Sequence, residues 1–595
     1  MTSSRSPLGR ACAAALIVVA GLFSAPALRA AEGPGASGVV EGRVLHGGSG
    51  DYLENARVAL EGTNLEAATR SDGSFTLAPL PAGTARLRVF FTGLAPQVLA
   101  VEVPAGATVR RDITLAPAGG RAGETVRLEA FAVAASREMD AAAIAINEQR
   151  FASNLRTVVS TDEFGTVAEG HVGEFMKFLP GVTMEYAGGN AREISINGAP
   201  AAYVPVTVDG FNLASAVGNG TGRAAAVDMV SINGLSRLEV SYSPTPDSPG
   251  SALAGSVNMV SRSAFERARP VFNGSAYVMM RDNRRETHRT AIPRETRTRK
   301  VYPGFDFSWV VPINRNLGFS LSGGRTTQYA GQDFSQNTWR GTGAATNGAA
   351  FPHTTPDRPY LTAYTVRGGG KETIRNSIAA TVDWRLGPRD RLTLALQAST
   401  FEENYSQQAL TFTINRVPPG AFSPAFTRGD AGAGAGTLQQ TNGGTYRFNR
   451  TYMPTLTWRH DGPVWKLDAG AGLSRARYTG ADIERGMFQN TTAQRTNVAI
   501  AFEDIFYLRP GAINVRDALT GAAVDPYSLS TYALTGTTSG VVDSNDRQRT
   551  VFGNARRDFG GVTPFSLKTG FDVREARRDL RPLTTNYAYV GADGR

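Results

Sequence analysis

Few residues of this chain belong to the types that most often carry out catalysis. The sequence has one cysteine and five histidines, and such residues commonly serve as nucleophiles, proton acceptors or metal ligands. The histidines are widely separated along the chain: His46, His171, His288, His353 and His460. The cysteine, Cys12, lies close to the N-terminus. We therefore expect no catalytic residue, no metal site and no cofactor.

Acidic residues are the next candidates, because two carboxyl groups held together can act as general acid and base. The middle of the chain contains five that stand out: Glu174, Glu185, Glu193, Asp209 and Glu239. No two of them occur at a fixed spacing, and no histidine accompanies them in a catalytic phrase. We expect these carboxylates to have structural or gating roles, and we expect the chain not to be an enzyme.

Residues 1–31 have the pattern of a secretory signal peptide. A short apolar run over residues 11–23 lies between basic residues and small residues: Arg5 and Arg10 before it, then Ala25, Ala27, Ala30 and Ala31. Cleavage is expected after Ala27, Ala30 or Ala31. A membrane-anchoring helix is the alternative, but the apolar run is too short to cross a bilayer. Cleavage would remove the only thiol, and with it any disulfide or thiolate chemistry.

Residues 38–117 alternate short strand patterns with turn signals. Strands are expected at 39–44, 56–60, 73–77, 86–90 and 98–103, and this close spacing predicts a small β-sandwich. Asp72 could be a calcium ligand, but calcium needs several converging oxygen atoms. The Asp72-Gly73 pair is sufficiently explained as a tight turn. The segment is similar to carboxypeptidase-regulatory-like domains.

The densest set of motifs lies in residues 138–262. Apolar residues with helical spacing precede a Pro-Gly stop: Val172, Phe175, Met176 and Leu179, then Pro180 and Gly181. Strands that end in turns are predicted at 193–198 and 204–210, with glycine as the last residue of each. Further strands are predicted at 238–240 and 256–261.

In this order, the phrases resemble the plug domain of TonB-dependent outer-membrane receptors. The residues that carry the resemblance are Phe175, Leu179, Pro180, Gly181, Asn197, Gly198, Asp209, Gly210, Glu239, Gly255 and Asn258. The resemblance implies a wide barrel around the plug, an energy source in the other membrane and a substrate too large or scarce for a porin. It also implies that plug carboxylates pair with arginines of the barrel wall.

Residues 118–137 are expected to form a linker followed by a coupling segment. The linker, 118–123, is rich in glycine. The segment after it resembles a TonB box through Glu124, Thr125, Val126, Leu128, Phe131 and Val133. Such a segment would add a strand to the periplasmic TonB-type protein by β-augmentation. The alternative is an ordinary first strand of the plug.

Residues 270–595 alternate with period two over stretches of roughly ten residues, the signature of an outer-membrane β-barrel. The clearest hairpin joins 377–386 to 391–401. Short connections alternate with long polar segments, which are expected to be outer loops at 282–302, 330–375, 406–444 and 479–545. Tryptophans near strand ends, such as Trp309, Trp384, Trp458 and Trp465, predict an aromatic girdle.

The fold class is therefore predicted to be mainly β: a small N-terminal sandwich, an α+β plug and an antiparallel transmembrane barrel. About nine barrel strands are expected, the last over 565–573, where the family's barrels have about twenty-two. We expect the chain to be the N-terminal part of a longer receptor.

The expected function is energised uptake of a scarce or bulky nutrient across the outer membrane. A glycan, a siderophore and a cofactor are all compatible, and the substrate-binding residues are unknown. The alternative is an outer-membrane signalling or surface-display protein. The net charge of +10 is attributed to solvated loops or contact with outer-membrane lipid and lipopolysaccharide. Nucleic acid is not expected, because no aromatic-and-basic recognition motif accompanies the charge.

Overall fold

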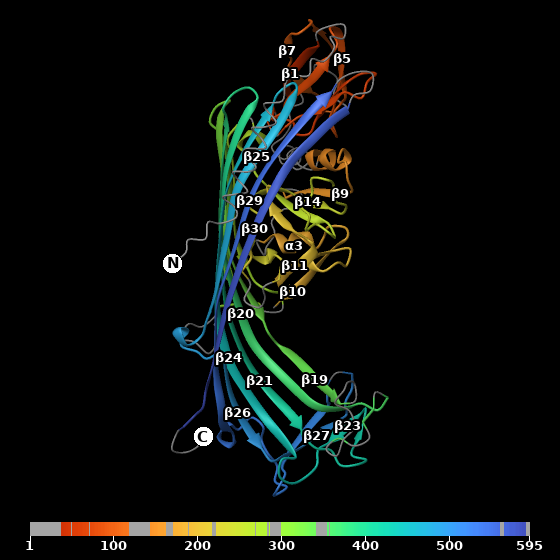
Figure 1. Cartoon of the computed structure of the whole chain (residues 1–595). Helices are drawn as coiled ribbons and strands as arrows, with labels where there is room; N and C mark the ends of the chain where they lie inside the picture. The colour runs from red at the N-terminus through yellow and green to blue at the C-terminus, as the bar shows by residue number, and fades with distance from the viewer. Residues whose placement is uncertain are drawn as a thin grey trace, which may run out of the picture.

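The computed structural model describes residues 37–48, 50–70, 72–117, 143–161, 171–187, 190–216, 222–267, 269–282, 285, 299–340, 351, 354, 355, 357–507, 509–559 and 565–590. The expected signal peptide therefore lies outside the described residues. Among the described residues, no helix combines the length and the apolar character that crossing a membrane requires. Three parts follow one another along the chain: a front sandwich, a plug and a tall curved sheet (Figure 1).

The front sandwich consists of two four-stranded sheets, β4-β1-β7 with β8 on β1, and β3-β2-β5-β6. Its strands are β1 (Gly38–His46), β2 (Arg57–Leu60), β3 (Glu66–Ala68), β4 (Ser74–Leu80), β5 (Gly83–Phe90), β6 (Gln97–Val103), β7 (Thr108–Arg110) and β8 (Ile113–Leu115). In β1 every second side chain is buried, so the two sheets enclose one apolar core. The sandwich predicted from the alternating pattern is confirmed.

The helix at residues 143–150 packs on the front sandwich. Ala143 belongs to the core of the sandwich. The Oδ1 of Asn147 accepts a hydrogen bond from the backbone N–H of Thr92 at 3.3 Å, and Phe151 lies edge-on to Phe90 with 6.3 Å between ring centres. The chain therefore contacts the sandwich a second time before it enters the plug.

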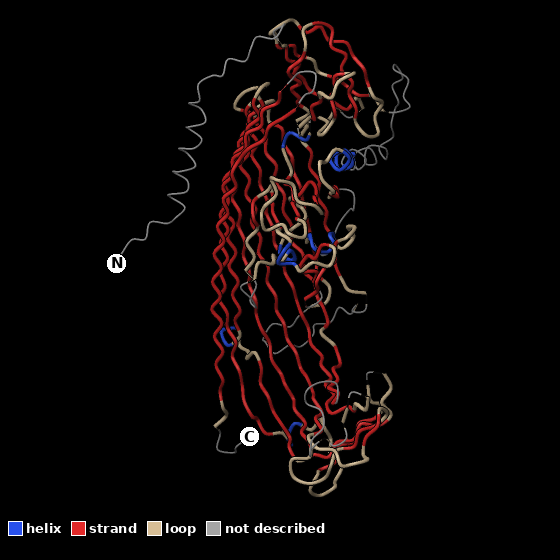
Figure 2. The backbone as a smooth tube through the Cα atoms, turned by 45° about the vertical axis from the view of Figure 1, so that its right-hand side comes forward, coloured by secondary structure: helices blue, strands red, loops and turns tan. Residues whose placement is uncertain are grey.

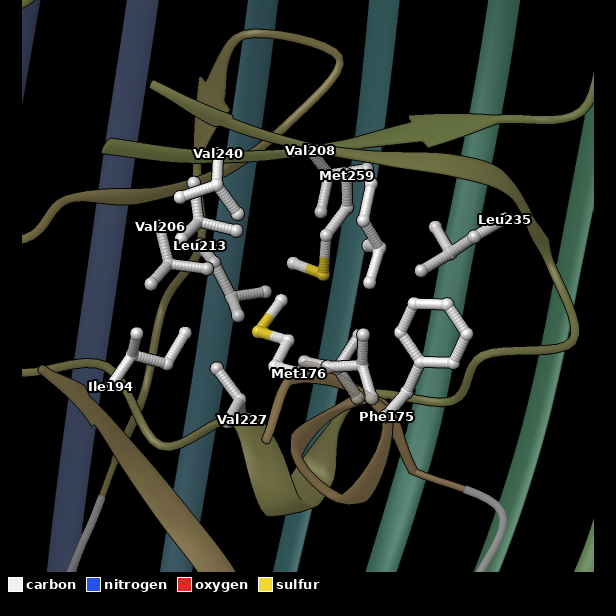
Figure 3. Packing of buried hydrophobic residues seen from close by; sticks show 14 of the residues in the cluster. Phe175, Met176, Ile194, Val206, Val208, Leu213, Val227, Leu235, Val240 and Met259 are labelled. Carbon is white, nitrogen blue, oxygen red and sulfur yellow. The ribbon is translucent and has the colours of Figure 1, made fainter. Parts of the chain in front are cut away.

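The plug combines a five-stranded sheet, β13-β12-β15-β14-β9, with the hairpin β10-β11. Its elements are β9 (Arg156–Ser160), α3 (Val172–Met176), β10 (Val182–Ala187), β11 (Asn190–Ile196), η1 (Ala201–Tyr203), β12 (Val206–Val208), β13 (Phe211–Asn212), η2 (Val227–Met229), β14 (Leu235–Ser241) and β15 (Ser256–Ser261), followed by η3 (Ala264–Glu266). Helix α3 ends three residues earlier than its apolar spacing predicts. The chain still buries Phe175, Met176 and Leu179 in the plug core, and Phe175 and Met176 face the sheet (Figure 3).

An eleven-stranded antiparallel sheet forms a wall along one side of the plug (Figures 1 and 2). Nine strands follow one another in pairing order: β16 (Val271–Met279), β17 (Tyr302–Pro312), β18 (Leu317–Gly331), β20 (Tyr360–Arg385), β21 (Asp390–Ile414), β24 (Gly436–Asp461), β25 (Trp465–Ala481), β29 (Ala533–Phe559) and β30 (Phe565–Tyr587). Two shorter strands, β19 (Phe334–Arg340) and β26 (Asn490–Thr496), pair with the ends of the long ones that lie away from the sandwich. The described sheet thus has two strands more than the nine expected, because these short additions have no clear alternation of their own.

The long strands extend well beyond their apolar part, and this corrects the predicted outer loops. The predicted hairpin is present as β20 and β21, where Arg385 faces Arg391 near the turn, but it continues to Ala363 opposite Thr413. Much of 330–375 and 406–444 is therefore strand. The pattern fails there because these segments are rich in polar residues and glycine, so neither face is consistently apolar.

The remaining outer segments form a small sheet, β22-β23-β27-β28. Its strands are β22 (Phe422–Ser423), β23 (Phe426–Arg428), β27 (Val498–Glu503) and β28 (Ala512–Asp517), and the short helices η4 (Ile483–Arg485) and η5 (Leu529–Thr531) lie in the same outer part of the sequence. An apolar core that includes Tyr360, Phe412 and Phe502 joins this sheet to the wall. These segments are thus a folded cap on the strand ends away from the sandwich (Figure 1).

Side chains alternate across the wall as the sequence predicts. Ile378, Val382 and Trp384 on β20 and Leu394 and Leu396 on β21 are exposed on the outer surface of the sheet. The residues between them, such as Thr381 and Asp383, are buried against the plug. The wall therefore has an apolar outer surface and a polar inner surface that holds the plug.

Two glycines of the wall make room for a plug aromatic ring. A Cβ atom added to Gly472 would lie 2.5 Å from the ring of Phe211, and one added to Gly470 would lie 2.8 Å from it. Phe211 also contacts Phe552 of β29, with 5.4 Å between ring centres. A side chain on β25 at this level would displace the plug from its seat.

We predict that Gly472→Val displaces Phe211 and costs about 1–3 kcal/mol, the usual cost of overpacking. Limited proteolysis should then cleave the plug of the folded chain faster than in the parent protein. Gly536→Val is the matched control, since an added Cβ there meets only one backbone oxygen, at 3.8 Å. Equal cleavage rates in both variants would contradict this account of the seat.

Candidate functional site: the plug and its contacts

Asn258 joins three of the separate plug phrases through its side-chain amide. Its Oδ1 accepts hydrogen bonds from the backbone N–H of Gly210 at 2.9 Å and from the Thr207 hydroxyl at 3.0 Å. Its Nδ2 donates to Glu239 at 3.2 Å. Both the oxygen and the nitrogen of this amide therefore have partners inside the plug. Through them Asn258 joins its own strand to β14 and to the turn after β12.

The Asp209-Gly210 turn is fixed from both sides. Both residues have positive φ angles, 51° and 83°, a conformation that glycine adopts without strain and aspartate tolerates. The Asp209 carboxylate accepts from the backbone N–H of Ser261 at 2.9 Å and from its hydroxyl at 2.6 Å. Burial nevertheless raises the pKa of Asp209. From the wall, Arg574 donates to the carbonyl oxygen of Gly210 at 3.1 Å.

A second group of predicted residues meets at the other end of the plug sheet. The backbone N–H of Asn197 donates to the carbonyl of Gly181 at 2.9 Å, and Tyr242 donates to the carbonyl of Pro180 at 2.5 Å. Gly181, Asn197, Gly198 and Gly255 all have positive φ. A Cβ atom at Gly255 would lie 2.5 Å from the Ser241 carbonyl oxygen. The motif residues outside the core are thus turn and close-approach positions.

Contacts between plug and wall follow only in part the expectation that plug carboxylates pair with wall arginines, since the plug carboxylate Asp247 pairs with a wall lysine, Lys568. Contacts of the opposite kind are also present, in which two wall carboxylates accept from plug backbone N–H groups. Asp546 of β29 accepts from Ser215 at 2.8 Å, and Asp383 of β20 accepts from Ala264 at 2.9 Å. Wall arginines complete both contacts, because Arg578 pairs with Asp546 at 2.9 Å and Arg391 with Asp383 at 2.7 Å. Sequence reasoning missed these residues, since an inward carboxylate on a strand has no local signal.

The plug carboxylates named from the sequence also have contacts within the plug, and the expectation that no two of them come together needs correction. Glu174 pairs with Lys177 at 2.6 Å. Glu185 and Glu193, which sequence spacing keeps apart, are direct cross-strand partners in the β10-β11 hairpin. Burial, with the neighbouring Glu185 charge, raises the pKa of Glu193. The antiparallel register of the hairpin places these two side by side. Their spacing in the sequence does not indicate this register.

Glu239 forms part of a joint between three parts of the chain. Arg237 of β14 lies 3.1 Å from Glu239, 2.8 Å from Glu148 of the helix at 143–150, and 3.4 Å from Glu54 of the sandwich. Arg156 adds a second positive charge, 3.7 Å from Glu148. Burial raises the pKa of Glu148 to about 8, against the attraction of Arg237, and the Glu239 charge supports this shift. The pKa of Glu239 is lowered although burial opposes that, because Arg237 stabilises its charged form.

The front sandwich also docks on the turns of the wall nearest to it. Arg389, in the β20-β21 turn, donates to Glu41 from two nitrogens at 3.0 and 2.9 Å. Arg385 pairs with Asp72, and Arg70 pairs with Asp461. Asp72 accepts from the Ser74 backbone N–H at 3.0 Å, as its predicted turn role requires. Its second role, as the partner of Arg385, has no signal in the sequence.

A cavity of about 140 Å³ lies between the Asp209 turn and the wall. Charged residues of both signs line it, among them Asp209, Arg237, Asp383, Arg391 and Arg459. It lies on the side of the plug near the sandwich joint, since Glu54 is part of its lining. The space and its polar lining suit several water molecules between plug and wall.

The histidines do not converge in the part of the chain that the structure describes. His171 is fully buried at the start of α3, and burial, together with the nearby charge of Arg375, lowers its pKa well below the usual value. His46 and His460 lie in the sandwich and at the end of β24, while His288 and His353 lie outside the described residues. No group of three or more histidine, cysteine or acidic residues among the described ones could hold a metal ion.

The predicted coupling residues Glu124, Thr125, Val126, Leu128, Phe131 and Val133 lie outside the described residues. The described chain resumes at residue 143 with the helix that carries Glu148. The predicted coupling segment thus ends at Val133, fifteen residues before Glu148 of the joint on Arg237.

Replacing Asn258 with alanine should loosen the plug without unfolding the wall. The change leaves the Gly210 N–H and Glu239 without this partner, at an expected cost of about 1–3 kcal/mol. Hydrogen exchange of the backbone N–H groups of β12 and β15 should become faster by the factor that corresponds to this loss of stability. Asn586→Ala is the control, since Asn586 is exposed and bonds only to Thr538 at 3.0 Å. Unchanged exchange in β12 and β15 would contradict the role of Asn258.

Glu148 should make the joint sensitive to pH. Its folded pKa of about 8 lies above the value near 4.3 in an unfolded chain. The folded state therefore holds the proton more tightly, and stability falls as pH rises between these values, by at most about 1.4 kcal/mol per pH unit. Hydrogen exchange of residues 143–150 should accelerate between pH 5 and pH 8 beyond the intrinsic change. Glu148→Gln should remove this excess, and an excess that survives in the variant would contradict the assignment.

Comparison with protein-family models gives two matches. Residues 39–116 match the carboxypeptidase regulatory-like domain, and residues 148–257 match the TonB-dependent receptor plug domain. A comparison with curated proteins gives no match.

Three solved structures illustrate the structural likeness. A type II cohesin–X-dockerin complex from Acetivibrio cellulolyticus has 20% identity and a TM-score of 0.12, with 13% of this chain and 56% of that chain covered. A mutant of the ferric enterobactin receptor PfeA from Pseudomonas aeruginosa, in complex with enterobactin, has 12% identity and a TM-score of 0.30, with 68% and 63% covered. The unliganded ferric citrate transporter FecA has 10% identity and a TM-score of 0.25, with 73% and 79% covered. The chain thus covers less than two thirds of the length of the first two of these structures.

The two family matches coincide with the front sandwich and with the domain seated on the wall. The motif residues named from the sequence lie within the second match, except Asn258, which follows its last residue. This chain therefore joins a carboxypeptidase regulatory-like domain to the plug domain of a TonB-dependent receptor.

Proposed function

We propose that the chain acts in TonB-dependent uptake of a nutrient across an outer membrane. The observation that carries the proposal is the seating of the plug: a domain of the TonB-dependent receptor type lies on the polar inner face of a wall whose outer face is apolar. A strand wall satisfies its backbone groups in lipid when it closes into a barrel, and under this proposal the described sheet from β16 to β30 is part of such a barrel. The plug would then be the gate of the passage.

The polar character of the plug–wall interface supports a gating role. Besides the apolar seat of Phe211, the contacts include hydrogen bonds and ion pairs around Asp383, Asp546 and Arg375, with a polar cavity beside them. Water can replace such contacts at small net cost. A plug held in this way can be loosened by a pull on the chain ahead of it.

The coupling segment would receive that pull. We propose that residues 124–133 add a strand to the periplasmic domain of a TonB-type protein. Force on this segment would reach the helix at 143–150 first, then the Glu148–Arg237 contact, and then β14 of the plug. The substrate class stays open among glycans, siderophores and cofactors.

Replacing Leu128 with proline should abolish binding to the purified periplasmic domain of the TonB-type protein from the same source, because proline removes a backbone donor that strand addition needs. Uptake should be lost in cells, while the protein still reaches the outer membrane. Ala122→Pro, in the preceding linker, is the control and should bind normally. Unimpaired binding by the Leu128 variant would overturn the coupling assignment.

Uptake itself is tested with a strain that lacks the gene for this chain. Its growth is measured with ferric siderophores, cobalamin-type cofactors or oligosaccharides as the limiting nutrient. The proposal would be supported by a growth defect on one of these nutrients if the parent chain restores growth and the Leu128→Pro variant does not. Growth equal to that of the parent strain on all three classes would favour signalling or surface display instead.

A further inference from the structure

Three arginines from three neighbouring strands lie side by side on the outer surface of the wall. Arg475 of β25 is the direct cross-strand partner of Arg547 of β29, and Arg547 is the direct partner of Arg577 of β30. Tyr452 of β24 continues the same row on the other side of Arg475. We call Arg475, Arg547 and Arg577 the arginine row.

The neighbours of the row show which way it faces. Ser474, next to Arg475, is buried and accepts from the plug backbone at Ala214. Asp546, next to Arg547, binds the plug at Ser215, and Arg578, next to Arg577, pairs with Asp546. Because side chains alternate across a strand, the arginine row points away from the plug. Arg475 and Arg577 are exposed, and Arg547 is half-buried.

Within the described part of the chain, no side chain forms a hydrogen bond or ion pair with a guanidinium of the row. The acidic residues nearby on this face already have other partners. Asp543 pairs with Arg477 at 2.9 Å, Glu575 with Arg549 at 3.1 Å and Asp579 with Arg581 at 2.7 Å. Like charges directly opposite each other destabilise a sheet. The row is therefore an uncompensated positive strip.

The height of the row on the wall identifies its surroundings. Arg475 lies ten residues along β25 from Trp465, its first residue, and a strand needs about 9–11 residues to cross a bilayer. Between them the outer surface carries Leu467, Ala469, Ala471 and Leu473, and β30 carries Phe571 and Val573 at the matching level. The sandwich docks at the opposite end of the wall. The row thus lies where the apolar band ends, at the level of lipid headgroups on the side away from the sandwich.

We propose that the arginine row is a binding site for phosphorylated lipid headgroups of the outer leaflet, as in the lipid A part of lipopolysaccharide. Guanidinium groups bind phosphate through paired hydrogen bonds, and an outer-leaflet lipid with more than one phosphate can span neighbouring arginines. Arg450 of β24, which is exposed and directly opposite Arg477, extends the strip for a second phosphate. The inference rests on the proposed function for the placement of the wall in an outer membrane.

The test uses the full-length chain, purified in a neutral detergent, and measures lipid binding by native mass spectrometry. The probes are lipid A with two phosphates and the same lipid after removal of both. We expect the parent protein to bind the phosphorylated form at least about tenfold more tightly, given the contribution of each arginine near an anionic lipid surface. Replacing Arg475, Arg547 and Arg577 together with glutamine should abolish this preference.

The matched control replaces three arginines of the outer segments that already have carboxylate partners, Arg416, Arg428 and Arg495, with glutamine. It removes the same charge and should keep the preference. The Leu128→Pro variant should keep it too, so that failure of coupling and failure of this site are distinguishable. Arg577→Gln alone, on the outermost strand, should weaken binding partially even if the triple variant folds poorly.

Three results would overturn the proposal. The first is equal binding of both lipids by the parent protein, and the second is an unchanged preference in the triple and single variants. The third is displacement of the lipid by inorganic phosphate at millimolar concentration, which would assign the row to a soluble anion.

Discussion

The seat of the plug against the wall is the contact on which the other features depend. Phe211 fits where β25 has glycine at two inward positions, and Asp383 and Asp546 accept backbone N–H groups of the plug. Both kinds of contact require the plug and a particular level of the wall to meet in one register. A shift of one residue in any strand pair would turn the inward carboxylates outward. The long antiparallel ladders of the wall therefore position the plug.

The contacts of this seat differ in kind from those inside the plug. Inside, an apolar core and the Asn258 hydrogen bonds join strands from distant parts of the sequence into one unit. At the wall, apolar contacts such as that of Phe211 with Phe552 occur together with hydrogen bonds, beside a cavity lined by polar residues. The plug thus has an apolar core of its own, while its seat combines apolar and polar contacts. This difference suits a domain that moves or rearranges as a unit.

The joint on Arg237 connects that seat to the front of the chain. One guanidinium faces carboxylates from the sandwich, from the helix at 143–150 and from the plug. With Arg156 as the second cation, three carboxylates share two positive charges, and the raised pKa of Glu148 is the expected response of such a group. The sandwich also holds the near turns of the wall through Glu41 and Asp72. The front domain therefore contacts both the plug and the wall.

The sequence by itself determined the order of the parts and the identity of the local positions. Alternation predicted the sandwich and the apolar outer face of the wall, and the plug phrases named turn residues such as Asp209, Gly210 and Asn258 that the structure brings together. These succeed because turns, strand faces and short helices are encoded by residues close in the chain. Only the tertiary structure decided which polar and charged groups lie next to each other. Asp383 with Ala264, Glu54 with Arg237 and Arg475 with Arg547 are each joined across a long separation in sequence. Their pairing follows from strand register and domain docking, and a single side chain carries no local trace of the partner that register will place opposite it.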